Sequence, residues 1–88
     1  MLEYHSAYYP MEDGWYLAKV LDLPGVVTQG KTLAGAKRML QDALREMAEW
    51  VLQEGDPLPS PKPKISDKKA LAHEPIRLLI RVQSGAAK

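Results

Sequence analysis

Residues 23–51 read LPGVVTQGKTLAGAKRMLQDALREMAEWV, and this stretch decides the fold. From residue 33 to residue 51, apolar side chains recur at steps of three and four, the period of one face of an α-helix. The apolar stripe consists of Leu33, Ala36, Leu40, Ala43, Leu44, Met47, Ala48 and Val51. Thr32 is a good N-cap and Gly55 a natural C-terminal stop. The stretch therefore predicts one amphipathic helix that buries a single side.

Charged residues of this helix fall mainly outside the apolar stripe. A spacing of four predicts ion pairs between Arg38 and Asp42 and between Arg45 and Glu49, each worth about 0.2–0.5 kcal/mol. Trp50 lies near the stripe, so its ring is expected to pack into the core.

Three strands are predicted before the helix. Residues 2–9 are rich in tyrosine, residues 15–21 are aromatic and aliphatic, and residues 26–29 form a short third strand that Gly30 is expected to stop. An Asp-Gly pair at 13–14 supplies a turn between the first two strands. Pro24-Gly25 fits a type II turn before the third. Short links between consecutive strands favour an antiparallel meander.

The chain after the helix is predicted to be a connector followed by one more strand. Residues 56–74 form the connector, and four of the seven prolines lie in its stiff, extended first part, residues 56–64. We expect residues 65–73 to be a loop. Residues 75–82 alternate apolar and polar side chains and predict the last strand. The tail, residues 84–88, is expected to fray.

These elements give the order β-β-β-α-β in a single α+β domain over residues 1–88, an antiparallel sheet with one helix packed on one face. A single helix leaves the other face of the sheet bare. Both faces of the first strand carry tyrosines, so an isolated monomer would expose a larger apolar patch than soluble monomers usually show. The pattern therefore favours a partner protein or self-association, as a dimer or tetramer.

Composition excludes several classes of protein. The chain has 88 residues and a formal net charge of +1, from 12 Lys+Arg against 11 Asp+Glu, so direct nucleic-acid binding is not indicated. No cysteine is present, which removes disulfides and thiolate metal sites. No apolar run approaches a membrane span, and the first residues lack the features of a secretory signal. A cytoplasmic location is the expectation.

No combination of residues predicts catalysis, a metal or a cofactor. His5 and His73 lie far apart in sequence and are expected to be edge or loop residues. The adjacent acids Glu12 and Asp13 fit solvated turn chemistry better than a metal site. The glycines at 25, 30 and 35 match neither a dinucleotide nor a phosphate loop, and a structural role is expected for them. The chain is therefore predicted not to be an enzyme.

Two features leave a nucleic-acid-binding role open as an alternative. One is a basic cluster, expected to be a solvated loop, that consists of Lys62, Lys64, Lys68 and Lys69. The other is a set of aromatic residues that could stack on bases but is favoured as core or interface: Tyr4, Tyr8, Tyr9, Trp15 and Tyr16.

With these elements in order, the sequence resembles the HicB family of antitoxins. The resemblance covers residues 4–61 and a plausible last strand. The residues that carry it are Tyr4, Asp13-Gly14-Trp15-Tyr16-Leu17-Ala18, Leu23-Pro24-Gly25-Val26-Val27-Thr28-Gln29-Gly30-Lys31-Thr32-Leu33, Ala36, Asp42-Ala43-Leu44, Trp50 and the exit Asp56-Pro57-Leu58-Pro59-Ser60-Pro61. The sequence departs from the family pattern at Gly35, usually acidic, and at Val26, frequently cysteine.

The resemblance implies a partial ribonuclease H-like fold without that enzyme's catalytic carboxylates. It also implies that the chain binds a HicA-type toxin, an mRNA-cleaving ribonuclease, and silences it by occluding its active site. A nuclease presents positive charge to RNA, so we expect an acidic and aromatic surface to meet it. The expected partner-binding residues are Tyr8, Tyr9, Glu12, Asp13 and Trp15.

Many members of the family append a DNA-binding domain, and no separate one is expected in this sequence, which leaves operator binding open. A second interpretation is a stand-alone oligomer of the same fold that serves as a scaffold or ligand-binding module. A neighbouring gene for a small basic protein would favour the antitoxin.

Overall fold

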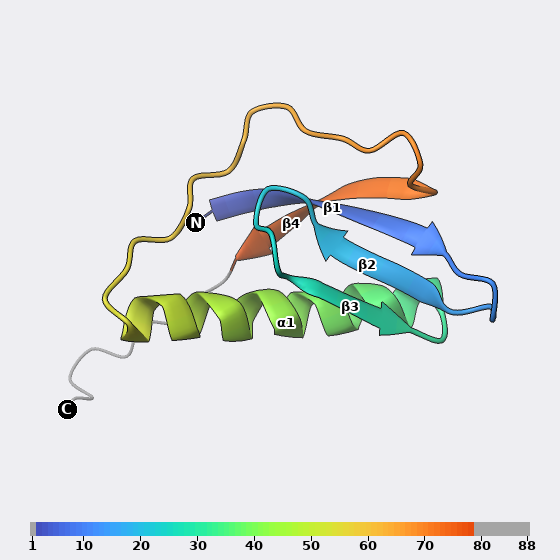
Figure 1. The fold of residues 1–88 in the computed structure, drawn as a ribbon, viewed down its shortest axis with the longest axis horizontal. Coiled ribbons are helices and arrows are strands. Elements are labelled where there is room, and N and C mark those ends of the chain that lie inside the picture. Colours follow the sequence, from blue (N-terminus) through green and yellow to red (C-terminus); the bar gives the residue numbers. More distant parts are fainter. Residues whose placement is uncertain (1, 79–88) are drawn as a thin grey trace.

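The computed structural model describes residues 2–78 and has four strands and one helix there (Figure 1). The elements are β1 (Leu2–Pro10), β2 (Tyr16–Val20), β3 (Val27–Gly30), α1 (Leu33–Gln53) and β4 (Ala72–Leu78). The order β-β-β-α-β and the α+β class are those predicted. Gly25 has a φ of +99°, and the Val26 N–H donates to the Leu23 carbonyl at 3.3 Å, as the predicted type II turn requires.

The sheet is antiparallel throughout, with the strands in the order β3-β2-β1-β4. The first strand of the sequence thus lies inside the sheet, and Tyr8 pairs with Ala18 of β2 on one side and with Ala72 of β4 on the other. Paired residues share a face of the sheet. The buried residues of the face that meets α1 are Tyr4, Ser6, Tyr8, Ala18, Val20, Ile76 and Leu78.

The helix buries the predicted stripe against this face. Leu40 and Leu44 are fully buried and share one core cluster with Tyr4 and Tyr8 of β1. Burying one large apolar side chain stabilises a fold by roughly 1.5–3 kcal/mol, so this cluster is the main source of stability. At the start of the helix, the Thr32 Oγ1 accepts a hydrogen bond from the Gly35 N–H at 2.9 Å, which confirms the predicted N-cap.

Two predictions about the outer side of α1 are wrong. Trp50 is 59% exposed, because it falls on the side of the helix that faces away from the sheet. The exposed ion pair of the second half of the helix joins Arg45 to Asp42 at 3.6 Å, with a spacing of three, and not to Glu49. Exposed pairs of this kind contribute little to stability, so sequence spacing alone does not choose between them.

Gly30 was predicted to stop the third strand after residue 29. In the structure, Gly30 is instead the last residue of β3. A Cβ atom built on Gly30 would lie 2.5 Å from the backbone nitrogen of Ala36. Only glycine lets the strand approach the first turn of α1 this closely. This contact fixes where the helix begins relative to the sheet.

The connector ends earlier than predicted. Residues 54–71 contain no helix or strand, but β4 already begins at Ala72, three residues before the expected Pro75. Pairing with β1 explains the difference, because Tyr8 and Ala7 offer partners to Ala72 and His73. The rest of the expected strand, residues 79–82, and the expected frayed tail lie outside the described residues.

The face of the sheet opposite α1 was expected to be bare. In the structure the connector covers part of it (Figure 1). Tyr9 points to this side, and its hydroxyl donates to the Asp67 carboxylate at 2.6 Å, while the Leu71 N–H donates to the Tyr8 carbonyl at 2.7 Å. Ala7 is fully buried on this face. The exposed part of the face lies toward β3, where Val27 is half exposed.

Candidate functional site

The turn between β1 and β2 presents the predicted acidic and aromatic residues at one end of the sheet. Gly14 has a φ of +89°, which lets the chain reverse between the strands. The Asp13 Oδ1 accepts the Trp15 N–H at 3.0 Å, and the Met11 N–H donates to the Trp15 carbonyl at 2.8 Å. The local sequence therefore builds a fixed turn in which Glu12 and Asp13 are exposed and Trp15 is half-buried.

Of the two tyrosines predicted to belong to this surface, only Tyr9 can do so. Tyr8 is 2% exposed, because alternation along β1 turns its ring toward the helix, so its assignment to the partner-binding surface is corrected. Tyr9 lies on the opposite face, with the Lys19 ammonium 5.0 Å from the centre of its ring. Burial and the hydrogen bond to Asp67 raise the pKa of Tyr9 to about 12, so its hydroxyl is a neutral donor at physiological pH.

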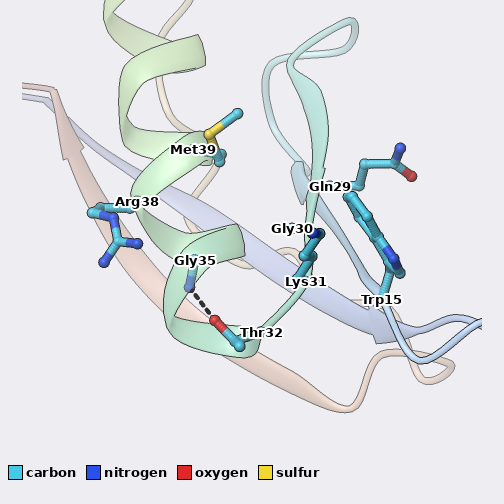
Figure 2. Close-up of a pocket in the computed structure, with 8 residues that line it drawn as sticks. All are labelled: Trp15, Gln29, Gly30, Lys31, Thr32, Gly35, Arg38 and Met39. Atoms are coloured by element: carbon cyan, nitrogen blue, oxygen red, sulfur yellow. Dashed lines mark hydrogen bonds between the residues drawn. The ribbon is translucent and has the colours of Figure 1, made fainter.

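Trp15 borders a hollow of about 300 Å³ that is open to solvent beside β3 and the start of α1 (Figure 2). Its lining consists of Trp15, Gln29, Gly30, Lys31, Thr32, Gly35, Arg38 and Met39. The Lys31 ammonium lies 5.8 Å from the centre of the Trp15 ring, a cation–π distance. Figure 2 shows the indole beside Gln29, across β3 from the helix. The aromatic residue is thus held in place and is accessible from one side.

A buried carboxylate that the sequence analysis did not single out joins the sheet to the connector. Asp22 is 3% exposed and accepts hydrogen bonds from the His5 N–H at 3.0 Å, from the His5 Nδ1 at 2.8 Å and from the Lys62 N–H at 3.2 Å. Burial by itself would raise the pKa of Asp22, but these hydrogen bonds outweigh it and keep the pKa below 3.8. In the sequence, Asp22 resembles an ordinary turn residue before Pro24-Gly25, so no signal pointed to it.

A second aspartate holds the connector farther along. The Asp67 carboxylate accepts the Tyr9 hydroxyl, and the Asp67 N–H donates to the His73 Nε2 at 2.9 Å. The hydrogen bond from Tyr9 is the main cause that lowers the pKa of Asp67. Both histidines were expected to be edge or loop residues. His73 lies in the edge strand β4, as expected, whereas His5 lies in the inner strand β1, and each bonds to an aspartate. We call the contacts of Asp22 and Asp67 the two connector clasps.

Charged side chains surround the aromatic residue of this surface. The acids Glu12 and Asp13 lie at the turn, and the cations Lys31 and Arg38 border the hollow. Across residues 2–78, no three His, Cys, Asp or Glu side chains lie where they could hold a metal ion. Within the same range, α1 is too polar to cross a bilayer. The arrangement suits the binding of another macromolecule through an aromatic residue with charged neighbours.

A family model described as UPF0150-like matches residues 4–59. Two curated proteins are similar to the chain, Antitoxin HicB of Escherichia coli (strain K12) and Antitoxin HicB of Escherichia coli O157:H7. Each is 32% identical over 54 residues, which cover 61% of this chain and 39% of the relative. The chain thus spans about two fifths of the length of the curated relatives it matches.

Solved structures share the fold. The N-terminal domain of the Burkholderia pseudomallei antitoxin HicB superposes with a TM-score of 0.73 at 18% identity and covers 90% of this chain and 100% of that domain. A structure described as the HicA3 and HicB3 toxin-antitoxin complex contains a chain that matches with a TM-score of 0.60 at 25% identity, over 72% of both chains. The predicted resemblance to HicB antitoxins and the predicted fold are therefore confirmed.

Proposed function

Because the chain belongs to the UPF0150-like family, we propose that it is an antitoxin that binds a HicA-type toxin and neutralises it by occluding the toxin's active site. The family match covers residues 4–59, and one structural neighbour comes from a complex described as a HicA and HicB pair. The role needs a rigid surface and no reaction, so the chain acts by binding. An mRNA-cleaving partner places this interaction in the cytoplasm.

One observation carries the choice of surface: the exposed acids and the indole lie on the same fixed turn. Glu12 and Asp13 are exposed, and the carboxylate of Asp13 bonds to the backbone of Trp15, so charge and contact area are held together. A toxin that binds RNA phosphates offers positive charge to this turn. Opposite charges accelerate association, while a buried indole slows dissociation. Tyr9 extends the surface along β1.

The test is the affinity for a HicA-type toxin, measured by calorimetry on the full chain. Trp15→Ala is expected to weaken binding at least about tenfold, or roughly 1.4 kcal/mol. Glu12→Lys leaves the Asp13 bond in place and is expected to slow association most strongly at low salt. Glu54→Lys is the control, because it makes the same charge change at the C-terminal end of α1 and leaves the turn between β1 and β2 unchanged.

Unchanged affinity in both turn variants would show that the toxin binds elsewhere. Failure of the wild-type chain to bind or inhibit any HicA-type toxin would refute the antitoxin role itself. The largest loss of affinity is expected for the chain that carries both Asp13→Lys and Trp15→Ala. Circular dichroism verifies that this variant is folded.

A further inference from the structure

The two edges of the sheet differ in how they meet another strand. An edge strand exposes unpaired backbone groups, and proteins usually protect such edges with proline or charge. β4 carries both, with Glu74, Pro75 and Arg77 within its range. β3 reads Val-Thr-Gln-Gly and carries neither. β4 is therefore protected against the addition of another strand, whereas β3 is not.

The backbone groups that β3 turns outward follow from its register. The Val20 N–H donates to the Val26 carbonyl at 3.0 Å, so Val26 faces β2. Antiparallel strands alternate residues bonded to the neighbour with residues bonded away from it. The N–H and C=O groups of Val27 and Gln29 therefore point away from the sheet at the open edge.

β4 is blocked to strand addition at its centre. The backbone N–H of His5 bonds to Asp22 and its carbonyl accepts from Leu21 at 2.8 Å, so His5 uses its backbone on the β2 side. Pro75 pairs with His5 and thus turns its own backbone away from β1, to the open edge. Proline has no N–H to offer there. Strand addition at β4 is disfavoured at the centre of the strand.

We propose that β3 pairs antiparallel with β3 of a second copy of this chain, about a two-fold axis at Thr28. In this register Val27 lies opposite Gln29 of the second copy, and the outward N–H and C=O groups of both residues find partners across the axis. The two sheets become one continuous sheet. A two-fold axis of this kind makes the interface self-complementary.

Charge and exposed apolar surface favour a second copy as the occupant. β3 has no charged residue, so self-pairing places no like charges opposite one another, which would be destabilising. An axis perpendicular to the sheet puts both α1 helices on the same side. There Met39, 50% exposed and part of the hollow beside β3, faces the other copy, and Val27, also 50% exposed, is covered on the other side.

The register gives a charge-swap test on the full chain. In the Val27→Glu and Gln29→Glu double variant, two carboxylates face two carboxylates across the axis, and self-association is expected to weaken at least about tenfold, or about 1.4 kcal/mol. The Val27→Glu and Gln29→Lys double variant sets opposite charges against each other and is expected to restore it. Within one chain, position 27 pairs with Lys19, which tolerates a glutamate.

Sedimentation equilibrium from micromolar to millimolar protein measures the association constants, and circular dichroism verifies folding of both variants. A wild-type chain that remains monomeric at millimolar concentration would overturn the proposal. So would equal association of the two variants. Toxin binding that is lost in the first variant while self-association persists would assign the β3 edge to the toxin instead and overturn the pairing of copies. The inference stands apart from the proposed function, because a dimer without a toxin would still pass this test.

Discussion

Asp22 shows how one residue holds two distant parts of the chain. Its carboxylate is almost entirely buried, and a buried charge is costly unless hydrogen bonds replace water. His5 supplies two of them from the central strand, and Lys62 supplies one from the connector. The aspartate is therefore stabilised in its charged form, and its contribution to folding depends on that charge.

We expect Asp22→Asn to lower the free energy of unfolding by about 1–3 kcal/mol at neutral pH, because the new amide would turn N–H groups toward N–H donors. The pKa of Asp22 is lowered on folding, so the stabilisation of the wild-type chain is complete above 3.8 and is lost as the pH falls through the folded value. Urea unfolding should show the gap between wild type and variant closing below pH 3.8. A gap that stays constant into acid would contradict this account.

The close approach of β3 to α1 can be tested by substitution at Gly30. Gly30→Ala is expected to destabilise the fold by about 1–3 kcal/mol, because the new methyl group meets the backbone of Ala36 and the strand or helix must shift. Gly35→Ala is the matched control: its methyl group meets only the Thr32 hydroxyl, and the change should stay within about 1 kcal/mol. Thermal unfolding of both variants measures the difference, and equal losses would mean that the close approach is unimportant.

At the scale of elements, the connector behaves as a strap held by the two connector clasps. Tyr9→Phe removes the hydroxyl that bonds to Asp67 and is expected to speed amide exchange at Lys69 and Leu71 about fivefold, or roughly 1 kcal/mol of local stability. Tyr16→Phe, on the face of the sheet toward the helix, is the control. Hydrogen exchange followed by mass spectrometry measures both. Unaltered exchange in Tyr9→Phe would mean that the clasp at Asp67 does not hold the connector.

The elements themselves could be predicted because their signals are local. The apolar period of residues 33–51, the cap at Thr32 and the Pro24-Gly25 turn each depend on near neighbours, and the structure confirms them. The path of the connector and the strand position of Gly30 depend on contacts with distant residues. No local pattern encodes those contacts. The turn at Glu12 and Asp13 could be predicted from the Asp13-Gly14 pair, but the burial of Tyr8 required the register of β1.

At the scale of the whole molecule, we expect toxin binding and self-association to be separable. The acidic turn joins β1 to β2, whereas the open backbone groups belong to β3. The Val27→Glu variant, which leaves Gln29 beside the Trp15 indole unchanged, is therefore expected to bind a HicA-type toxin within about threefold of wild-type affinity, since the substitution leaves the turn intact. Calorimetry measures the affinity. The mass of the complex in solution is expected to correspond to one toxin per chain for both the wild-type chain and the variant. A variant that no longer binds toxin would tie the two surfaces together.

The pairing of β1 with β4 joins residues 2–8 to residues 72–78, so the central strand gains its second neighbour only from a segment some seventy positions later. During synthesis, β1 leaves the ribosome long before β4 exists and waits with one side unsatisfied. The helix and the hairpin can form early, because their contacts are short-range, whereas closure of the sheet must await nearly the whole chain. A nascent chain cut before residue 72 would therefore offer a vacant place beside β1 to any extended peptide nearby.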